Sequence, residues 1–335
     1  MQRTQLLSRR APALAMSMFA TLVLAACGGG GSDRVLDDGT ATIYAADAAQ
    51  IGSDAASVAD GAVRAAQAMV AAGAGAMASD GRASAQSAEV QPLATSSKPC
   101  PGGGSASVSI TGGTPASELN GKLDTGEVYQ VSFAACTGAA GYGQLDGTLA
   151  MTVVSATGDS TNGALSLSTT ATGLMLTSPR GTATLNGSTQ RDYAVATDSD
   201  GTVHLSSRFV TPNVTLATRY NSRSSLFTLS ATDIQRTATL LGGVLQSSTV
   251  MGTHTLAATL PNATFSYTVA TTGGATTYGA DGLPTSGAWT ITLSQNIVTV
   301  TIANAMATIT IDHGKDGTID RTFTIPVAQL AGSAG

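Results

Sequence analysis

Apolar and polar residues alternate along most of the chain after Cys100, as expected for strands that bury one face. Val, Ile and Leu recur at alternate positions, and Thr and Ser fill many of the positions between them. The alternation predicts strands over Glu127–Cys136, Gly147–Ala156, Ala164–Leu176, Gly181–Leu185, Asp192–Thr197, Thr202–Val210, Asn213–Arg219, Leu226–Thr232, Thr237–Leu241, Val244–Val250, Thr253–Leu260, Ala263–Ala270, Ala288–Ser294, Ile297–Ile302, Ala307–Asp312 and Thr318–Ile325.

Short turns separate these strands, at pairs such as Asp200-Gly201, Gly242-Gly243, Asp281-Gly282 and Asp316-Gly317. Short links place consecutive strands antiparallel, and no segment suited to a helical crossover lies between them. The predicted fold class is therefore all-β. We expect an antiparallel meander that forms a curved, partly closed sheet or barrel, or a sandwich.

The segment before the strands has a different composition, with 17 alanines among the 40 residues from Ala41 to Asp80. On a helical wheel, the larger apolar side chains share one broad arc with Ala62: Tyr44, Ile51, Val58, Met69, Val70 and Met77. Ser53, Asp60 and Arg64 lie opposite. Two interpretations remain open: a helix that packs on the β domain or on a partner, and, favoured here, a mobile and partly helical stalk.

The N-terminus carries a short apolar run, Ala11 to Ala26, after Arg3, Arg9 and Arg10, with no acidic residue. Sixteen residues are fewer than the roughly 20 that span a bilayer as a helix. The run ends in Leu24-Ala25-Ala26-Cys27. This segment resembles the signal peptides of bacterial lipoproteins, in which the cysteine at the cleavage site receives acyl chains such as palmitate.

That resemblance implies three parts: a signal peptide at 1–26, a lipidated Cys27 with a Gly/Ser spacer and alanine-rich stalk at 27–99, and a β domain at 100–335. Gly28, and not an aspartate, follows the cysteine. By analogy with lipoprotein sorting, this favours the outer membrane, with the domain on the periplasmic or the surface side.

An acylated Cys27 would leave two further cysteines, Cys100 and Cys136. In an oxidising envelope an even pair predicts a disulfide, which would stabilise the fold by roughly 4 kcal/mol on the chain-entropy model. The alternative is two free, buried thiols.

The net charge and the motifs that are missing exclude several classes of function. Without the three signal-peptide arginines, 13 basic residues face 21 acidic ones, a formal net charge of −8. A weakly acidic chain without a basic run is a poor candidate for binding nucleic acid. No nucleophile elbow, paired-histidine zinc motif, phosphate loop or dinucleotide fingerprint occurs, so we expect no cofactor and no catalytic residues.

The chain has three histidines, His204, His254 and His313. They are expected to be exposed or hydrogen-bonded residues of strands and turns.

One segment, Asp312 to Asp320, partly matches a calcium loop, with acids at Asp312, Asp316 and Asp320 and a glycine at Gly317. Gly314 and Phe323 stand where an EF-hand has oxygen ligands, so we favour a hairpin turn without metal.

Two further stretches resemble uncharacterised all-β proteobacterial envelope lipoproteins. One is the tail from Pro284 to Leu330, and the other is Cys100-Pro101-Gly102-Gly103-Gly104 with the later Cys136. The resemblance implies an envelope location and supplies no activity.

Three functions follow, in order of preference. The first is an outer-membrane-anchored lipoprotein with a non-enzymatic binding or structural role. It would contact the membrane through its N-terminal lipid, and its partner would be an envelope protein or an apolar ligand. The second is a carrier of an apolar ligand on a half-open sheet, with a pocket lined by Leu174, Leu176, Val195, Phe209 and Phe227. The third is a hydrolase, which would need a histidine beside a serine and an acid.

Overall fold

The computed structural model describes residues 95–113, 123–137, 143–159, 161–179, 181–261 and 263–328. The predictions for the signal peptide, Cys27 and the alanine-rich segment lie outside these residues.

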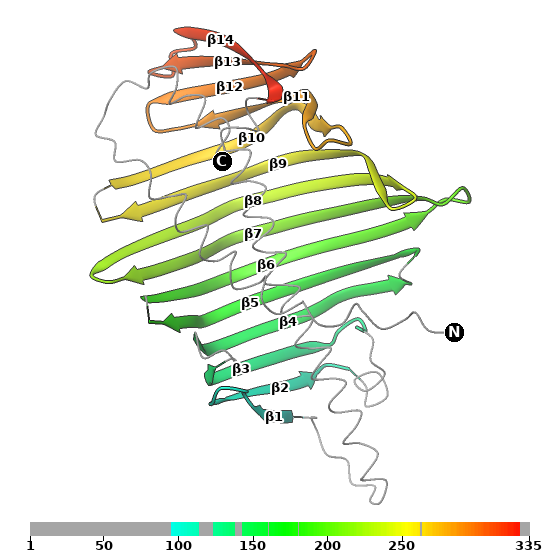
Figure 1. Cartoon of the computed structure of the whole chain (residues 1–335), viewed down its shortest axis with the longest axis vertical. Helices are drawn as coiled ribbons and strands as arrows, with labels where there is room; N and C mark the ends of the chain where they lie inside the picture. The colour runs from blue at the N-terminus through cyan, green and yellow to red at the C-terminus, as the bar shows by residue number, and fades with distance from the viewer. Residues whose placement is uncertain are drawn as a thin grey trace, which may run out of the picture.

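The described residues form one sheet of fourteen strands whose spatial order is their order along the chain (Figure 1). The strands are β1 (Thr95–Pro99), β2 (Ser105–Thr111), β3 (Val128–Thr137), β4 (Gln144–Gly158), β5 (Gly163–Ser178), β6 (Gly181–Thr197), β7 (Thr202–Tyr220), β8 (Arg223–Leu241), β9 (Val244–Leu260), β10 (Ala263–Tyr278), β11 (Pro284–Thr292), β12 (Asn296–Ala303), β13 (Met306–His313) and β14 (Arg321–Pro326). Every neighbouring pair is antiparallel. The all-β antiparallel meander is confirmed. The described sheet is not closed, because β1 and β14 are its opposite edges and do not pair.

The central strands β6 to β9 are longer than the sequence predicted, at 17 to 19 residues each. The alternation had divided each of them into two shorter strands. In β7 the division falls at Pro212, where the regular register is interrupted. In β8 the register is interrupted between Ser230 and Asp233, at the end of the first of its two predicted strands. A β-bulge shifts the alternation by one residue, so the pattern breaks in the sequence while the strand continues.

Glycine makes one of these irregularities possible. Gly252 of β9 has φ +139°, and a Cβ there would come within 1.9 Å of the carbonyl oxygen of Asp233. Only glycine allows the two backbones to approach this closely.

The two faces of the sheet differ in character. On one face, the register aligns Val108, Val131, Leu149, Ala171, Gly187, Val214, Leu229, Leu256 and Tyr267 in a single row from β2 to β10. We call this side the apolar face. The opposite, polar face carries Ser and Thr, including a row of Thr290, Thr299, Thr310 and Thr322 across β11 to β14.

The core is concentrated at the two ends of the apolar face. At one end, Ile110, Tyr129, Met151, Val153 and Leu167 form a cluster on β2 to β5. At the other end, a larger cluster spans β10 to β14 and the turn after it: Tyr267, Val269, Trp289, Ile291, Val298, Val300, Ile302, Ala307, Ile309, Ile311 and Val327.

Candidate binding face

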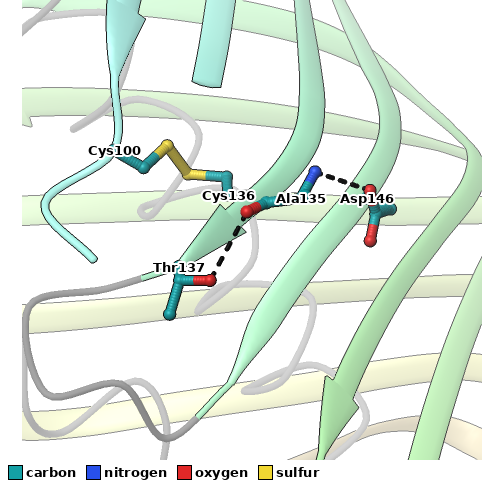
Figure 2. Close-up of a disulfide and its surroundings, with 5 residues drawn as sticks. All are labelled: Cys100, Ala135, Cys136, Thr137 and Asp146. Carbon is teal, nitrogen blue, oxygen red and sulfur yellow. Dashed lines mark hydrogen bonds between the residues drawn. A yellow bond between two sulfur atoms is a disulfide. The ribbon is translucent and has the colours of Figure 1, made fainter. Parts of the chain in front are cut away.

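The predicted disulfide between Cys100 and Cys136 is present, with the two Cα atoms 5.4 Å apart (Figure 2). It joins the turn after β1 to the end of β3, across the intervening strand β2. Close backbone contacts accompany it: the Thr137 N–H donates to the Gly103 carbonyl at 2.9 Å, and the Ala135 N–H donates to the Asp146 carboxylate at 2.7 Å. The disulfide therefore fixes the N-terminal edge of the sheet.

The glycines after Cys100 allow this packing. Gly104 has φ +73°, and a Cβ at this position would lie 2.0 Å from the Ala135 carbonyl oxygen. The Cys-Pro-Gly-Gly-Gly stretch thus has a structural reason within this fold, because the chain must pass directly against β3.

The residues predicted to line an apolar pocket do share one face. Leu174 and Phe227 belong to a row, Leu174–Leu185–Leu216–Phe227–Ala258–Phe265, that crosses β5 to β10. Phe209 lies on the same face, 5% exposed. However, the two hollows identified on the described residues, of about 360 and 300 Å³, are lined largely from the polar face, by residues such as Thr184, Leu226 and His204. Of the five predicted residues, only Val195 lines either of them.

In the middle of the sheet the apolar face carries buried cationic and polar side chains. Arg191 of β6 is 4% exposed, and its guanidinium lies 5.0 Å from the ring centre of Phe209 and 5.7 Å from that of Tyr193. Burial lowers the pKa of Arg191, and the nearby positive charge of Arg236 lowers it further. The aromatic rings offset part of the cost of burying this charge through cation–π attraction.

His254 of β9 is the second such group. Its side chain is 4% exposed, its Nε2 has no hydrogen-bond partner, and burial lowers its pKa to about 4. His254 therefore differs from the expectation of an exposed or hydrogen-bonded histidine. Its strand places it opposite Val269 on the apolar face, so the imidazole is buried neutral.

The other two histidines agree with the expectation. His204 is exposed and lies 2.9 Å from the Asp198 carboxylate, at the turn between β6 and β7. The His313 Nδ1 lies 3.0 Å from the Asn296 side-chain oxygen. Neither of these two contacts joins a histidine to a serine.

The Asp312 to Asp320 segment is a hairpin connection between β13 and β14, as favoured from the sequence. The Asp312 carboxylate accepts the N–H groups of Asp316 and Gly317, at 3.2 and 3.0 Å. The Asp320 carboxylate accepts the His313 N–H at 2.6 Å. Both carboxylates are thus used to hold the turn. In the described part of the chain, no group of three or more His, Cys, Asp or Glu side chains is arranged to hold a metal.

The sequence analysis did not predict that Arg191 lies on the apolar face. The predicted strands ended at Leu185 and resumed at Asp192, so Arg191 had no assigned face. In the structure β6 continues between them, and Arg191 shares the side of Leu185, Gly187 and Tyr193. Reading the period-two alternation through Gly187 would have placed it on the apolar face.

The fold and this face define an all-β protein built on one open meander sheet. Comparison with family models, curated proteins and solved structures gives no match to this chain. No helix in the described residues is long and apolar enough to cross a membrane.

Proposed function

We propose that this protein is a lipoprotein of the bacterial outer membrane, anchored by an acylated Cys27, with a non-enzymatic binding or structural role. The observation that carries the proposal is Leu24-Ala25-Ala26-Cys27 at the end of a short apolar run after three arginines. Each buried methylene of an acyl chain contributes about 0.8 kcal/mol to membrane affinity, so several chains hold a protein firmly.

Two features of the described residues support this proposal. The Cys100–Cys136 disulfide suits an oxidising compartment. The functional surface would be the sheet itself, since the sequence contains no nucleophile elbow, paired-histidine zinc motif, phosphate loop or dinucleotide fingerprint. A wide sheet with one polar and one apolar face provides area for binding a partner.

The anchor is tested by Cys27→Ser. We expect the variant to move from the membrane to the soluble fraction of the envelope and to lose labelling by radioactive palmitate. The matched control is Cys100→Ser, which also removes a cysteine but keeps Leu24-Ala25-Ala26-Cys27 intact. This variant should stay membrane-bound and labelled. Membrane association of Cys27→Ser equal to that of the control would refute the proposal.

A second candidate, a carrier of an apolar ligand, is favoured by the apolar row from Leu174 to Phe265. It predicts that the protein purified with Cys27→Ser carries stoichiometric lipid that organic solvent extracts. Lipid-free protein with an unchanged fold would count against the carrier and leave the anchored structural role in place.

A further inference from the structure

At the C-terminal end of the sheet, the apolar face is more completely buried than the sheet itself can explain. Val298, Val300, Ile309 and Ile311 are 0% exposed. Yet strands make substantial contacts only with their neighbours in the sheet, so the described strands do not form a second layer. A side chain on an uncovered sheet face keeps part of its surface in contact with solvent. These side chains therefore need a cover that the described strands do not supply.

The described turns supply little of that cover. Outside the strands, only Leu283, Leu293 and Val327 pack against the cluster of β10 to β14. Three side chains do not cover a cluster that crosses five strands. The short segments between and after the strands, 114–122, 138–142 and 329–335, have at most nine residues each and few apolar ones.

We propose that the alanine-rich segment 41–80 forms the second layer, as a helix or a broken pair of helices lying on the apolar face. The N-terminal run at 1–26 is excluded as the cover on the condition that it is a cleaved signal peptide, which rests on the proposed function. The alanine-rich segment is then the one remaining stretch with a continuous apolar arc, from Tyr44 to Met77.

Its dimensions fit the sheet. Forty residues of helix extend for about 60 Å. Fourteen strands at a spacing of about 4.8 Å span a similar distance. Fourteen residues separate Asp80 from Thr95, where β1 begins, which is enough chain to return from the face to that edge. Alanine side chains also allow a helix to approach a sheet closely.

The charges are complementary. The apolar face carries Arg191 and Arg236, and no described strand from β5 to β10 places a carboxylate on it. Residues 41–80 contain four aspartates and a single arginine. Asp47 and Asp54 precede Ile51 and Val58 of the apolar arc by four residues each, so on a helix they border the arc. A helix lying on the face would bring carboxylates towards the two guanidinium groups.

Trp289 provides a reporter, because it is the single tryptophan of the chain and lies on the apolar face, 5% exposed. The test uses the mature chain with Cys27→Ser, so that neither acyl chains nor detergent compete for the face. One variant places two charges in the arc, Ile51→Asp with Val58→Asp. The matched control places the same two charges on the opposite side, Ser53→Asp with Gln67→Asp.

We expect the arc variant to red-shift the Trp289 emission and to raise acrylamide quenching severalfold, while the control matches the unchanged protein. Circular dichroism verifies that each variant keeps its β signal. Should the arc variant fail to fold, a chain without residues 41–80 is titrated with the synthetic 41–80 peptide, and recovery of Trp289 shielding supports the proposal.

Three results would overturn it. The first is equal shielding of Trp289 in the arc variant and the control, or no recovery with the peptide. The second is shielding that is lost on dilution, which would identify a second copy as the cover. The third is shielding that disappears when bound lipid is extracted, which would identify an amphiphile.

Discussion

On β11 to β13 the apolar face carries mainly aliphatic side chains, of which Val298, Val300 and Ile309 are fully buried. On β6 to β9 the same face contains Arg191, His254 and the buried threonines Thr211 and Thr232. Burial of aliphatic groups stabilises at about 25 cal/mol per Å², whereas burial of charged or polar groups costs free energy unless they find partners. The same face therefore supplies stability at its ends and, in its middle, groups that can distinguish one covering surface from another.

The largest effect is expected at the N-terminal end, from Cys100→Ser combined with Cys136→Ser. Removing a cross-link between residues 36 apart in sequence should lower the free energy of unfolding by about 4 kcal/mol. Hydrogen exchange should show faster exchange in β2 to β4 and little change in β11 to β13. Uniformly faster exchange would show instead that the two ends unfold as one unit.

A smaller loss is expected at the C-terminal end, from Ile309→Ala. The side chain is fully buried, so its truncation should cost about 3 kcal/mol. The matched control is Leu205→Ala in the middle of the same face, where Leu205 is 40% exposed and should cost less than about 1 kcal/mol. Urea denaturation measures both, and equal costs would remove the distinction between ends and middle.

The middle of the face should also respond to pH through His254. The pKa of this histidine is lowered from 6.5 to about 4 in the folded state, so between these values the unfolded chain binds the extra proton. Stability should therefore be complete above pH 6.5 and fall as the pH decreases, by about 2 kcal/mol at pH 5.

His254→Gln should remove this part of the pH dependence, whereas His204→Gln, at an exposed position, should keep it. Denaturation curves at pH 7 and pH 5 measure the difference. A pH dependence that is the same in both variants would assign it to other groups.

The smallest effect is expected from Arg191→Lys. The substitution keeps the charge but removes the planar group between Phe209 and Tyr193, which should cost about 1 kcal/mol. The control is Arg208→Lys, whose guanidinium pairs with Asp233 on the polar face at an exposed position and should matter less. Equal effects would mean that the aromatic contacts add nothing.

Much of the fold could be predicted from local alternation. In a meander each strand pairs with its neighbour in sequence, so strands and turns determine the topology once their order is known. The strands β1 and β2 were missed because Thr95–Pro99 contains no Val, Ile, Leu or aromatic residue and Ser105–Thr111 contains only two large apolar residues. Their pairing depends on the disulfide and on β3, and local patterns carry neither.

The binding face was harder to predict, because its composition depends on register across strands. The neighbours of Arg191 depend on the β-bulges in β5 and β7. After each bulge, the alternation of side chains between the two faces is shifted by one residue. Similarly, the position of His254 depends on its pairing with Val269 of β10, which lies 15 residues further along the chain. The disulfide was predictable, because only two cysteines remained to pair.

An open sheet leaves two edges with unpaired backbone groups, and here both edge strands are short and end in proline. β1 has five residues and ends at Pro99, and β14 has six and ends at Pro326. Proline offers no N–H to an incoming strand, and a short edge gives it few bonds to form. Long, unprotected edges would otherwise put copies of the protein at risk of joining edge to edge into fibrils. The length and composition of these two strands are suited to keeping each sheet separate.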